Sequence, residues 1–68
     1  MEQDKSDLMK VMEVLSDELE GVEEYAKLVE SVNDPAIKKT FASILADEKR
    51  HVHALKEHVD SAINALMK

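Results

Sequence analysis

The 68-residue sequence contains no cysteine and no tryptophan, and only one glycine, one proline, one tyrosine and one phenylalanine. Without cysteine, disulfide bonds, zinc–thiolate sites, iron–sulfur clusters and thiol catalysis are excluded. Because glycine and proline punctuate strands and turns, their scarcity favours an all-α fold. Apolar runs never approach the ~20 residues of a membrane span, and the N-terminal MEQDKSDL lacks the apolar core of a signal peptide. We therefore expect a soluble, cytoplasmic protein.

Charge and length limit the remaining classes of protein. Nine Lys and Arg residues against 15 Asp and Glu residues give a formal charge of −6. A nucleic-acid surface would need basic patches or stacking aromatics, so neither nucleic acid nor membrane is expected as a partner. A single domain over residues 1–68 is short, and below ~70–80 residues one core rarely supplies more than ~3–5 kcal/mol. Metal binding or self-association is expected to add the missing stability.

Two sets of helix signals divide the chain. Ser6 can cap a helix that starts at the next residue. In Asn33-Asp34-Pro35, the three residues can in turn close one helix, cap the next and occupy its first position. The sequence therefore predicts a disordered tip, a helix over about 7–32 and a second helix over about 35–66. Two such helices joined by a tight connection form an antiparallel hairpin.

Apolar residues recur at alternating spacings of 3 and 4 along both helices, which is the pattern of helices that pack in bundles. The stripe of the first helix is Leu8, Val11, Leu15, Glu18, Val22, Tyr25, Val29 and Val32. The stripe of the second helix is Ile37, Phe41, Ile44, Glu48, His51, Leu55, His58 and Ala62. Other apolar residues would remain wet in a lone hairpin: Met12, Leu19, Ala26, Leu45, Val52 and Val59. A homodimer that forms a four-helix bundle is the simplest way to cover them.

Polar residues interrupt both stripes. Glu18 and Glu48 lie almost equally far from the turn, so in an antiparallel hairpin their heights differ by only ~1.5 Å. His51 follows Glu48 by one helical turn, which makes residues 48–51 an E-x-x-H motif. Two carboxylates at one level repel each other unless one is protonated or a cation lies between them. The three side chains are therefore candidate metal ligands.

A Glu from one helix and E-x-x-H from its neighbour are half of the ligand set of di-iron and di-manganese bundles. A two-fold dimer would supply Glu18, Glu48 and His51 twice, so four carboxylates would balance the charge of two divalent ions. Such ligands suit Fe(II), Mn(II) or, less selectively, Zn(II). The E-x-x-H motif alone is weak. For Glu18 the alternative is a solvent-facing side chain with Leu19 in the core, and for His51 it is an ordinary interface histidine.

The segments DELEGVEEY at 17–25 and DEKRH at 47–51 resemble the encapsulated-ferritin type of ferritin-like protein and, more distantly, rubrerythrin. The similarity covers roughly residues 14–58. That family has two long antiparallel helices per subunit and builds its di-iron ferroxidase centre only across a subunit interface. The resemblance implies Glu18, Glu48 and His51 as its ligands, and two iron ions per dimer, with Mn or Zn as alternatives.

The resemblance also implies roles around the centre. Tyr25 would be a neighbour hydrogen-bonded to the centre, although ordinary packing is the alternative, and Asp17 and Glu20 would lie where metal enters. The sequence departs from the family at Glu24, where the family has an aromatic residue, and at Gly21, often Ala. The family resides in encapsulin shells, so the resemblance implies an encapsulin compartment as an alternative to the free cytoplasm. The family's extra C-terminal helix and shell-docking tail have no counterpart here, which counts against residence in a shell.

The expected function is oxidation of Fe(II) by O₂ or peroxide, that is, a ferroxidase-type oxidoreductase. Two alternatives stay open: a metal-free structural or protein-binding hairpin, and a rubrerythrin-like peroxide reductase. Gly21 lies one turn from Glu18, where a glycine costs a helix about 1 kcal/mol relative to Ala. Close approach of a partner helix would explain it.

Overall fold

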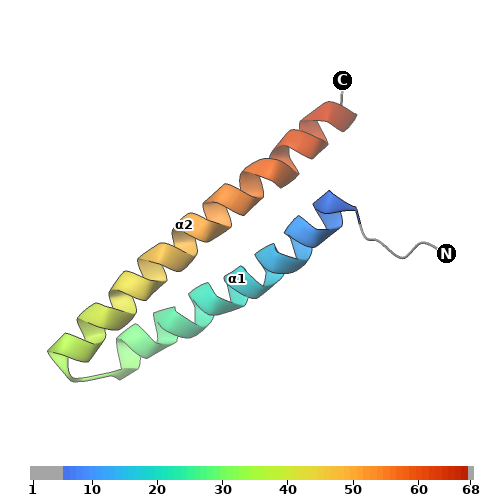
Figure 1. Ribbon diagram of the computed structural model, residues 1–68. Helices are drawn as coiled ribbons and strands as arrows, with labels where there is room; N and C mark the ends of the chain where they lie inside the picture. Colours follow the sequence, from blue (N-terminus) through green and yellow to red (C-terminus); the bar gives the residue numbers. More distant parts are fainter. Residues whose placement is uncertain (1–5, 68) are drawn as a thin grey trace.

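The computed structural model describes residues 6–67, and within them the chain forms two helices (Figure 1). Helix α1 spans Asp7–Ser31 and helix α2 spans Pro35–Leu66. The helices run antiparallel and pack along their length, which confirms the expected all-α hairpin. Helix α1 ends one residue before its expected boundary. The tip expected to be disordered lies outside the described residues.

The expected caps are confirmed at both helix starts. The Ser6 side chain accepts a hydrogen bond from the Met9 N–H at 3.2 Å. Asp34 Oδ1 accepts from the N–H groups of the second and third residues of α2, at 2.8 and 3.0 Å, and Pro35 occupies the first position. These bonds satisfy N–H groups that have no partner inside a helix.

The end of α1 differs from the expectation. Asn33 does not close the helix with a left-handed residue, because no described residue other than glycine has a positive φ. The chain instead leaves α1 at Val32, which is extended. A lysine of the other helix helps to satisfy the last carbonyls: Lys38 Nζ donates to Val29 O at 2.6 Å. Helix α1 has no basic residue in its own last turn, so this interaction depends on the hairpin.

The hairpin is a single layer of helices. Its extents are 50 × 30 × 13 Å, and the smallest is close to the diameter of one helix with its side chains, ~10–12 Å. Helix α2 is seven residues longer than α1 and projects beyond it at the open end (Figure 1). Leu66, near the end of this projection, is 84% exposed. No described helix is long and apolar enough to cross a membrane.

The seam between the helices follows the expected stripe of the first helix and most of that of α2. Every residue of the first stripe from Val11 to Val32 is half-buried, and so are five of the eight residues of the second stripe. In the second half of α2, Val52 and Val59 are half-buried, whereas His51 and His58 are exposed. The prediction that both histidines lie inside the stripe is therefore wrong. The valine beside each histidine occupies the seam because burying an apolar side chain is favourable and burying an imidazole is costly.

The seam does not amount to a closed core, because no described residue is fully buried. Several large apolar side chains remain exposed, Met12 by 51% and Leu19 by 50% among them. The expectation that Ala26, Leu45, Val52 and Val59 would stay wet is wrong, since these four are half-buried. Two helices alone thus leave apolar surface on α1 uncovered.

Candidate metal centre

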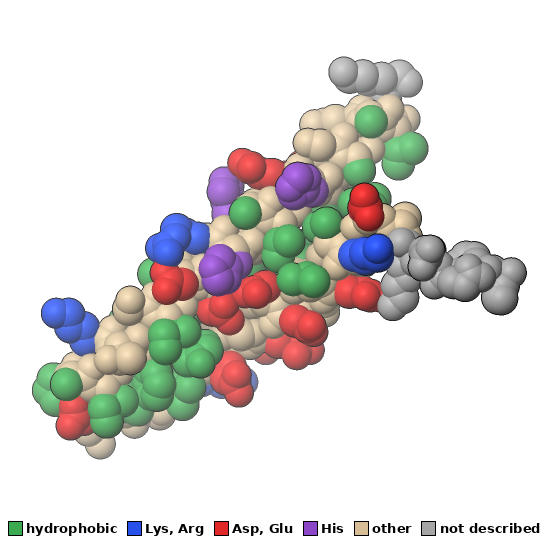
Figure 2. Space-filling model, in the orientation of Figure 1, with side chains coloured by type: hydrophobic (Ala, Val, Ile, Leu, Met, Phe, Trp, Pro, Cys, Tyr) green, Lys and Arg blue, Asp and Glu red, His purple; other side chains and the backbone are tan. Residues whose placement is uncertain are grey.

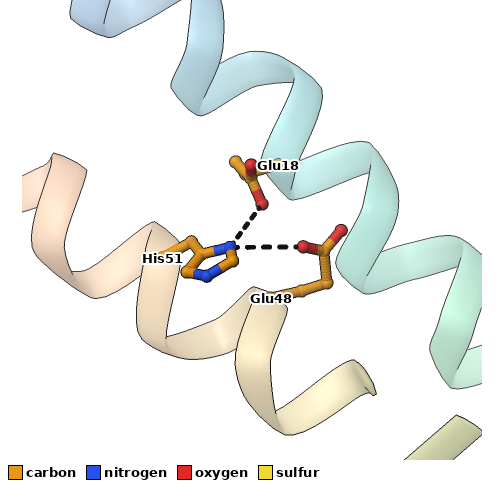
Figure 3. Close-up of side chains that lie close together, drawn as sticks. All are labelled: Glu18, Glu48 and His51. Carbon is orange, nitrogen blue, oxygen red and sulfur yellow. Dashed lines mark hydrogen bonds and ion pairs between the residues drawn. The ribbon is translucent and has the colours of Figure 1, made fainter.

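Glu18, Glu48 and His51 meet near the middle of the hairpin (Figure 3). His51 Nδ1 lies 3.3 Å from Glu18 Oε1 and 3.4 Å from Glu48 Oε1. Glu18 reaches this point from α1 and the other two residues from successive turns of α2. The structure therefore brings Glu18 beside His51, a residue 33 positions later in the sequence.

The spacing of the donor atoms suits a metal ion. One ligand atom from each residue lies within 4.8 Å of the other two. Ligands about 2.0–2.2 Å from a common ion stand roughly 3 to 4.4 Å apart. The group would therefore need only small side-chain movements to close on an ion. Two carboxylates and one imidazole are also the donor types that Fe(II), Mn(II) and Zn(II) accept.

Each of the two carboxyl groups disfavours the negative charge of the other. A hydrogen bond with Glu18, followed by burial and by the negative charge of Glu18, raises the pKa of Glu48 above its ordinary value of 4.5, and His51 opposes this in part. The side chains of Glu18 and Glu48 are only 25% and 20% exposed. Water therefore screens their repulsion less than it would on an open surface. A divalent cation would remove the repulsion and favour the charged form of both groups.

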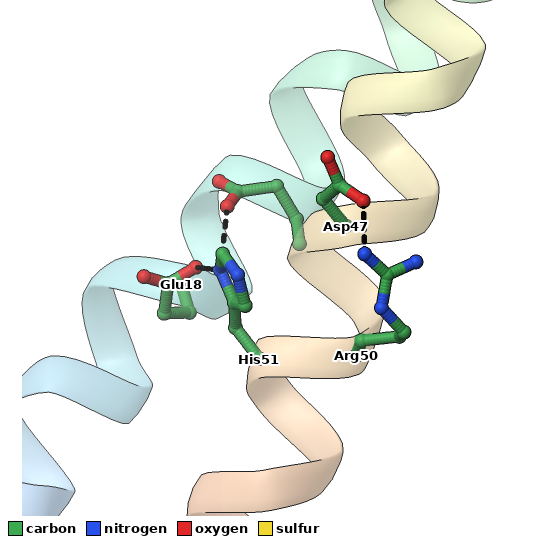
Figure 4. A network of polar contacts seen from close by, with 5 residues as sticks. Glu18, Asp47, Arg50 and His51 are labelled. Carbon is green, nitrogen blue, oxygen red and sulfur yellow. Dashed lines mark hydrogen bonds and ion pairs between the residues drawn. The ribbon is translucent and has the colours of Figure 1, made fainter.

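No arginine or lysine of the described residues forms an ion pair with either carboxylate of the group. Arg50 lies inside the E-x-x-H motif, but its guanidinium pairs with Asp47 (Figure 4). This pair points away from His51 in the same view. The group thus carries two acidic side chains and one imidazole with no fixed cation beside them.

The group is open on one side. His51 is 55% exposed. On the face shown in Figure 2, acidic and histidine side chains occupy the middle of the hairpin, while hydrophobic side chains gather toward the turn and toward the open end. A second molecule could therefore approach the three side chains directly.

Sequence reasoning missed which atoms lie against Gly21. A Cβ atom at this position would overlap Glu48 Oε2 and stand 3.2 Å from Glu48 Cδ. The close approach expected there comes from a side chain of the same hairpin. The signal that could have located it is the height of Gly21, which in an antiparallel hairpin lies close to that of Glu48.

The other predicted site residues are not among the three side chains that converge. The Tyr25 ring packs on Phe41, with ring centroids 5.9 Å apart and an angle of 57° between the planes. Its role beside the centre stays a prediction. Asp17 and Glu20 are exposed on α1, and Glu20 borders a shallow depression that Glu23 and Glu24 also line.

Comparison with known proteins identifies no family for this chain: no family model, no curated protein and no solved structure matches it.

Proposed function

We propose that the hairpin is half of a ferritin-like di-metal protein, in which two copies form a four-helix bundle that binds and oxidises Fe(II). The observation that carries the proposal is the convergence of Glu18, Glu48 and His51 on one point. Iron is the substrate in this reading, and Mn(II) or Zn(II) would be alternative occupants. The ferroxidase activity, the dimer and the metal are all parts of this proposal.

The ligand set supports a centre shared by two chains. Three donors from one hairpin are half of the set that di-iron carboxylate bundles use, namely a Glu from each of two helices and Glu-x-x-His from each of the other two. Doubling the group gives four carboxylates and two imidazoles. Their formal charge of −4 would balance two divalent ions, which is the condition under which such a cluster can be buried.

The surface of the hairpin supports a second copy as the missing partner. Large apolar side chains of α1 remain exposed, Met12 by 51% and Leu19 by 50%. A second copy that covered them would stabilise both chains, because burying apolar surface is favourable. In the proposed bundle it would also enclose the open side of His51.

In this proposal the residues of the chain bind iron, hold it in place and manage protons. Each Fe(II) gives up one electron, so two ions reduce one peroxide with two protons to water, or one O₂ with two protons to peroxide. Glu18 and Glu48 would hold the ions as carboxylates. Because the pKa of Glu48 is raised, iron binding would release a proton wherever Glu48 is protonated in the metal-free protein.

An anaerobic titration with Fe(II) tests the proposal. We expect the metal-free protein to saturate near one ion per chain and to develop visible absorption when air is admitted. Glu48→Ala and His51→Ala should abolish both results. His53→Ala and Glu57→Ala are matched controls on the same helix, because both residues are exposed and, within residues 6–67, pair with each other alone. If the site variants bind and oxidise iron like the wild type, the proposal is wrong.

The choice of oxidant separates two forms of the proposal. Faster oxidation by H₂O₂ than by O₂ would favour the peroxide reductase alternative, in which a partner protein supplies electrons because this chain has no cysteine for a rubredoxin-type centre. A dimer that forms equally well in the wild type and in both site variants, with no Fe(II) bound or oxidised by any of the three, would favour the metal-free structural or protein-binding hairpin.

A further inference from the structure

Gly21 stands in the middle of α1 without a backbone reason for being glycine. Among the described residues, glycine included, none has a positive φ, so residue 21 adopts a conformation open to every amino acid. Alanine would form the helix more readily at this position. What distinguishes the position is the space beside its Cα.

That space is filled by the carboxylate of Glu48. A Cβ at residue 21 would overlap Glu48 Oε2 and would also lie 3.2 Å from Cδ and 3.8 Å from Cγ of the same side chain. Figure 3 shows the Glu48 side chain crossing from α2 to the surface of α1. Glu48 therefore reaches the group by lying against α1 where no side chain projects.

The overlap would displace Glu48 rather than separate the helices. The atoms that a Cβ would meet all belong to the outer part of one flexible side chain, and none belongs to the backbone of α2. Rotating a side chain away is far less costly than moving a packed helix. A Cβ at residue 21 would consequently disturb Glu48 Oε1, which lies 3.4 Å from His51 Nδ1.

We infer that Gly21 is a positioning residue for the metal centre: the missing Cβ provides the space in which Glu48 lies so that its carboxylate faces Glu18 and His51. The inference rests on the proposed function for its effect on metal binding. The contact between Gly21 and Glu48 stands without it. Gly21 itself touches no metal in this reading and acts only through Glu48.

Two measurements on Gly21→Ala test the inference, and their expected results have opposite signs. In the metal-free protein, better helix propensity should raise the melting temperature by about 4–8 °C. Affinity for Fe(II), measured anaerobically, should fall by about tenfold or more, as for other residues that orient metal ligands. Ser43→Ala, an exposed serine of α2, is the matched control. It should raise the melting temperature and leave Fe(II) affinity unchanged.

A double-mutant cycle with Glu48→Ala tests the contact without metal. The rise in melting temperature caused by Gly21→Ala should be larger in the Glu48→Ala background, because no carboxylate then has to leave its preferred place. Equal rises in both backgrounds would overturn the inference, as would a fall in both. Unchanged Fe(II) affinity in Gly21→Ala would overturn it as well. If the wild type binds no Fe(II), the proposed function fails, and the metal-free cycle still decides whether Gly21 positions Glu48.

Discussion

Dilution of the protein is the most direct test of whether two hairpins together form the folded unit. No described side chain of the hairpin is fully buried, so folding and association should be coupled. For a dimer that unfolds to two separate chains, each tenfold dilution destabilises the folded state by about 1.4 kcal/mol. A monomeric hairpin would show no such dependence.

The size of the effect follows from the chain length. A dimer of two 68-residue chains has an unfolding entropy of about 0.29 kcal/mol/K, taking ~2.1 cal/mol/K per residue. Dividing the dilution energy by this entropy predicts a fall in melting temperature of about 5 °C per tenfold dilution. The exposed apolar side chains of α1, Met12 and Leu19 among them, are the surface that we expect the dimer to cover.

Thermal melts followed by circular dichroism at about 1, 10 and 100 µM would measure this shift. Sedimentation equilibrium on the same samples should give twice the 7.7 kDa chain mass at the highest concentration. Melts repeated with Fe(II) under anaerobic conditions should lie higher, because a ligand that binds only the folded state stabilises it. A melting temperature that stays constant over this range, together with the mass of one chain, would mean that the hairpin folds alone and that the dimer does not form.

Three further predictions concern single side chains. Because Glu18 raises the pKa of Glu48, the folded chain holds the proton of Glu48 to higher pH than the unfolded chain does. The unfolding free energy of the metal-free protein should therefore fall as pH rises above 4.5 and through the raised pKa of Glu48. Urea denaturation at several pH values would measure it. Glu48→Gln should remove that contribution, and an unchanged pH profile would contradict it. Asp34→Ala should destabilise the chain by about 1 kcal/mol through loss of the cap of α2. Ser6→Ala should cost less, because it removes one longer hydrogen bond. If thermal melts show the larger loss for Ser6→Ala, this ranking of the two caps is wrong. Tyr25→Phe should change stability by less than about 0.5 kcal/mol, because the ring contact remains. Slower iron oxidation in this variant would indicate that the hydroxyl reaches the centre, and an unchanged rate would leave packing as its role.

Much of the fold could be predicted from the sequence because its signals are local. A serine or aspartate before a helix start and a proline at the first position act through their immediate neighbours, so Ser6 and Asp34 could be identified as caps without knowledge of the rest of the chain. The scarcity of glycine and proline indicated the all-α class, and the spacing of the apolar residues indicated the facing side of α1 and most of that of α2. The end of α1 could not be predicted in the same way, since Lys38 caps it from the other helix.

The candidate site was predictable to the level of helix height but not of helix rotation. Equal distance from the turn brings Glu18 and Glu48 together, because helix rise is fixed at ~1.5 Å per residue. The spacing of the apolar residues did not decide which of two neighbouring residues of α2, His51 or Val52, faces α1. His51 was expected inside the stripe, whereas the structure places it on the exposed rim, with Val52 in the seam.

That this chain is helical, where its helices start and which three donor side chains stand at one height can all be read from the amino-acid order, because these properties depend on local propensity and on a regular rise. How far each helix is rotated about its axis, and with it which atoms touch, is known only from the folded hairpin. Rotation depends on the packing of side chains from both helices at once. That packing lays Glu48 against the bare Cα of Gly21, leaves His51 open to one side, and directs Arg50 to Asp47 rather than to the two carboxylates.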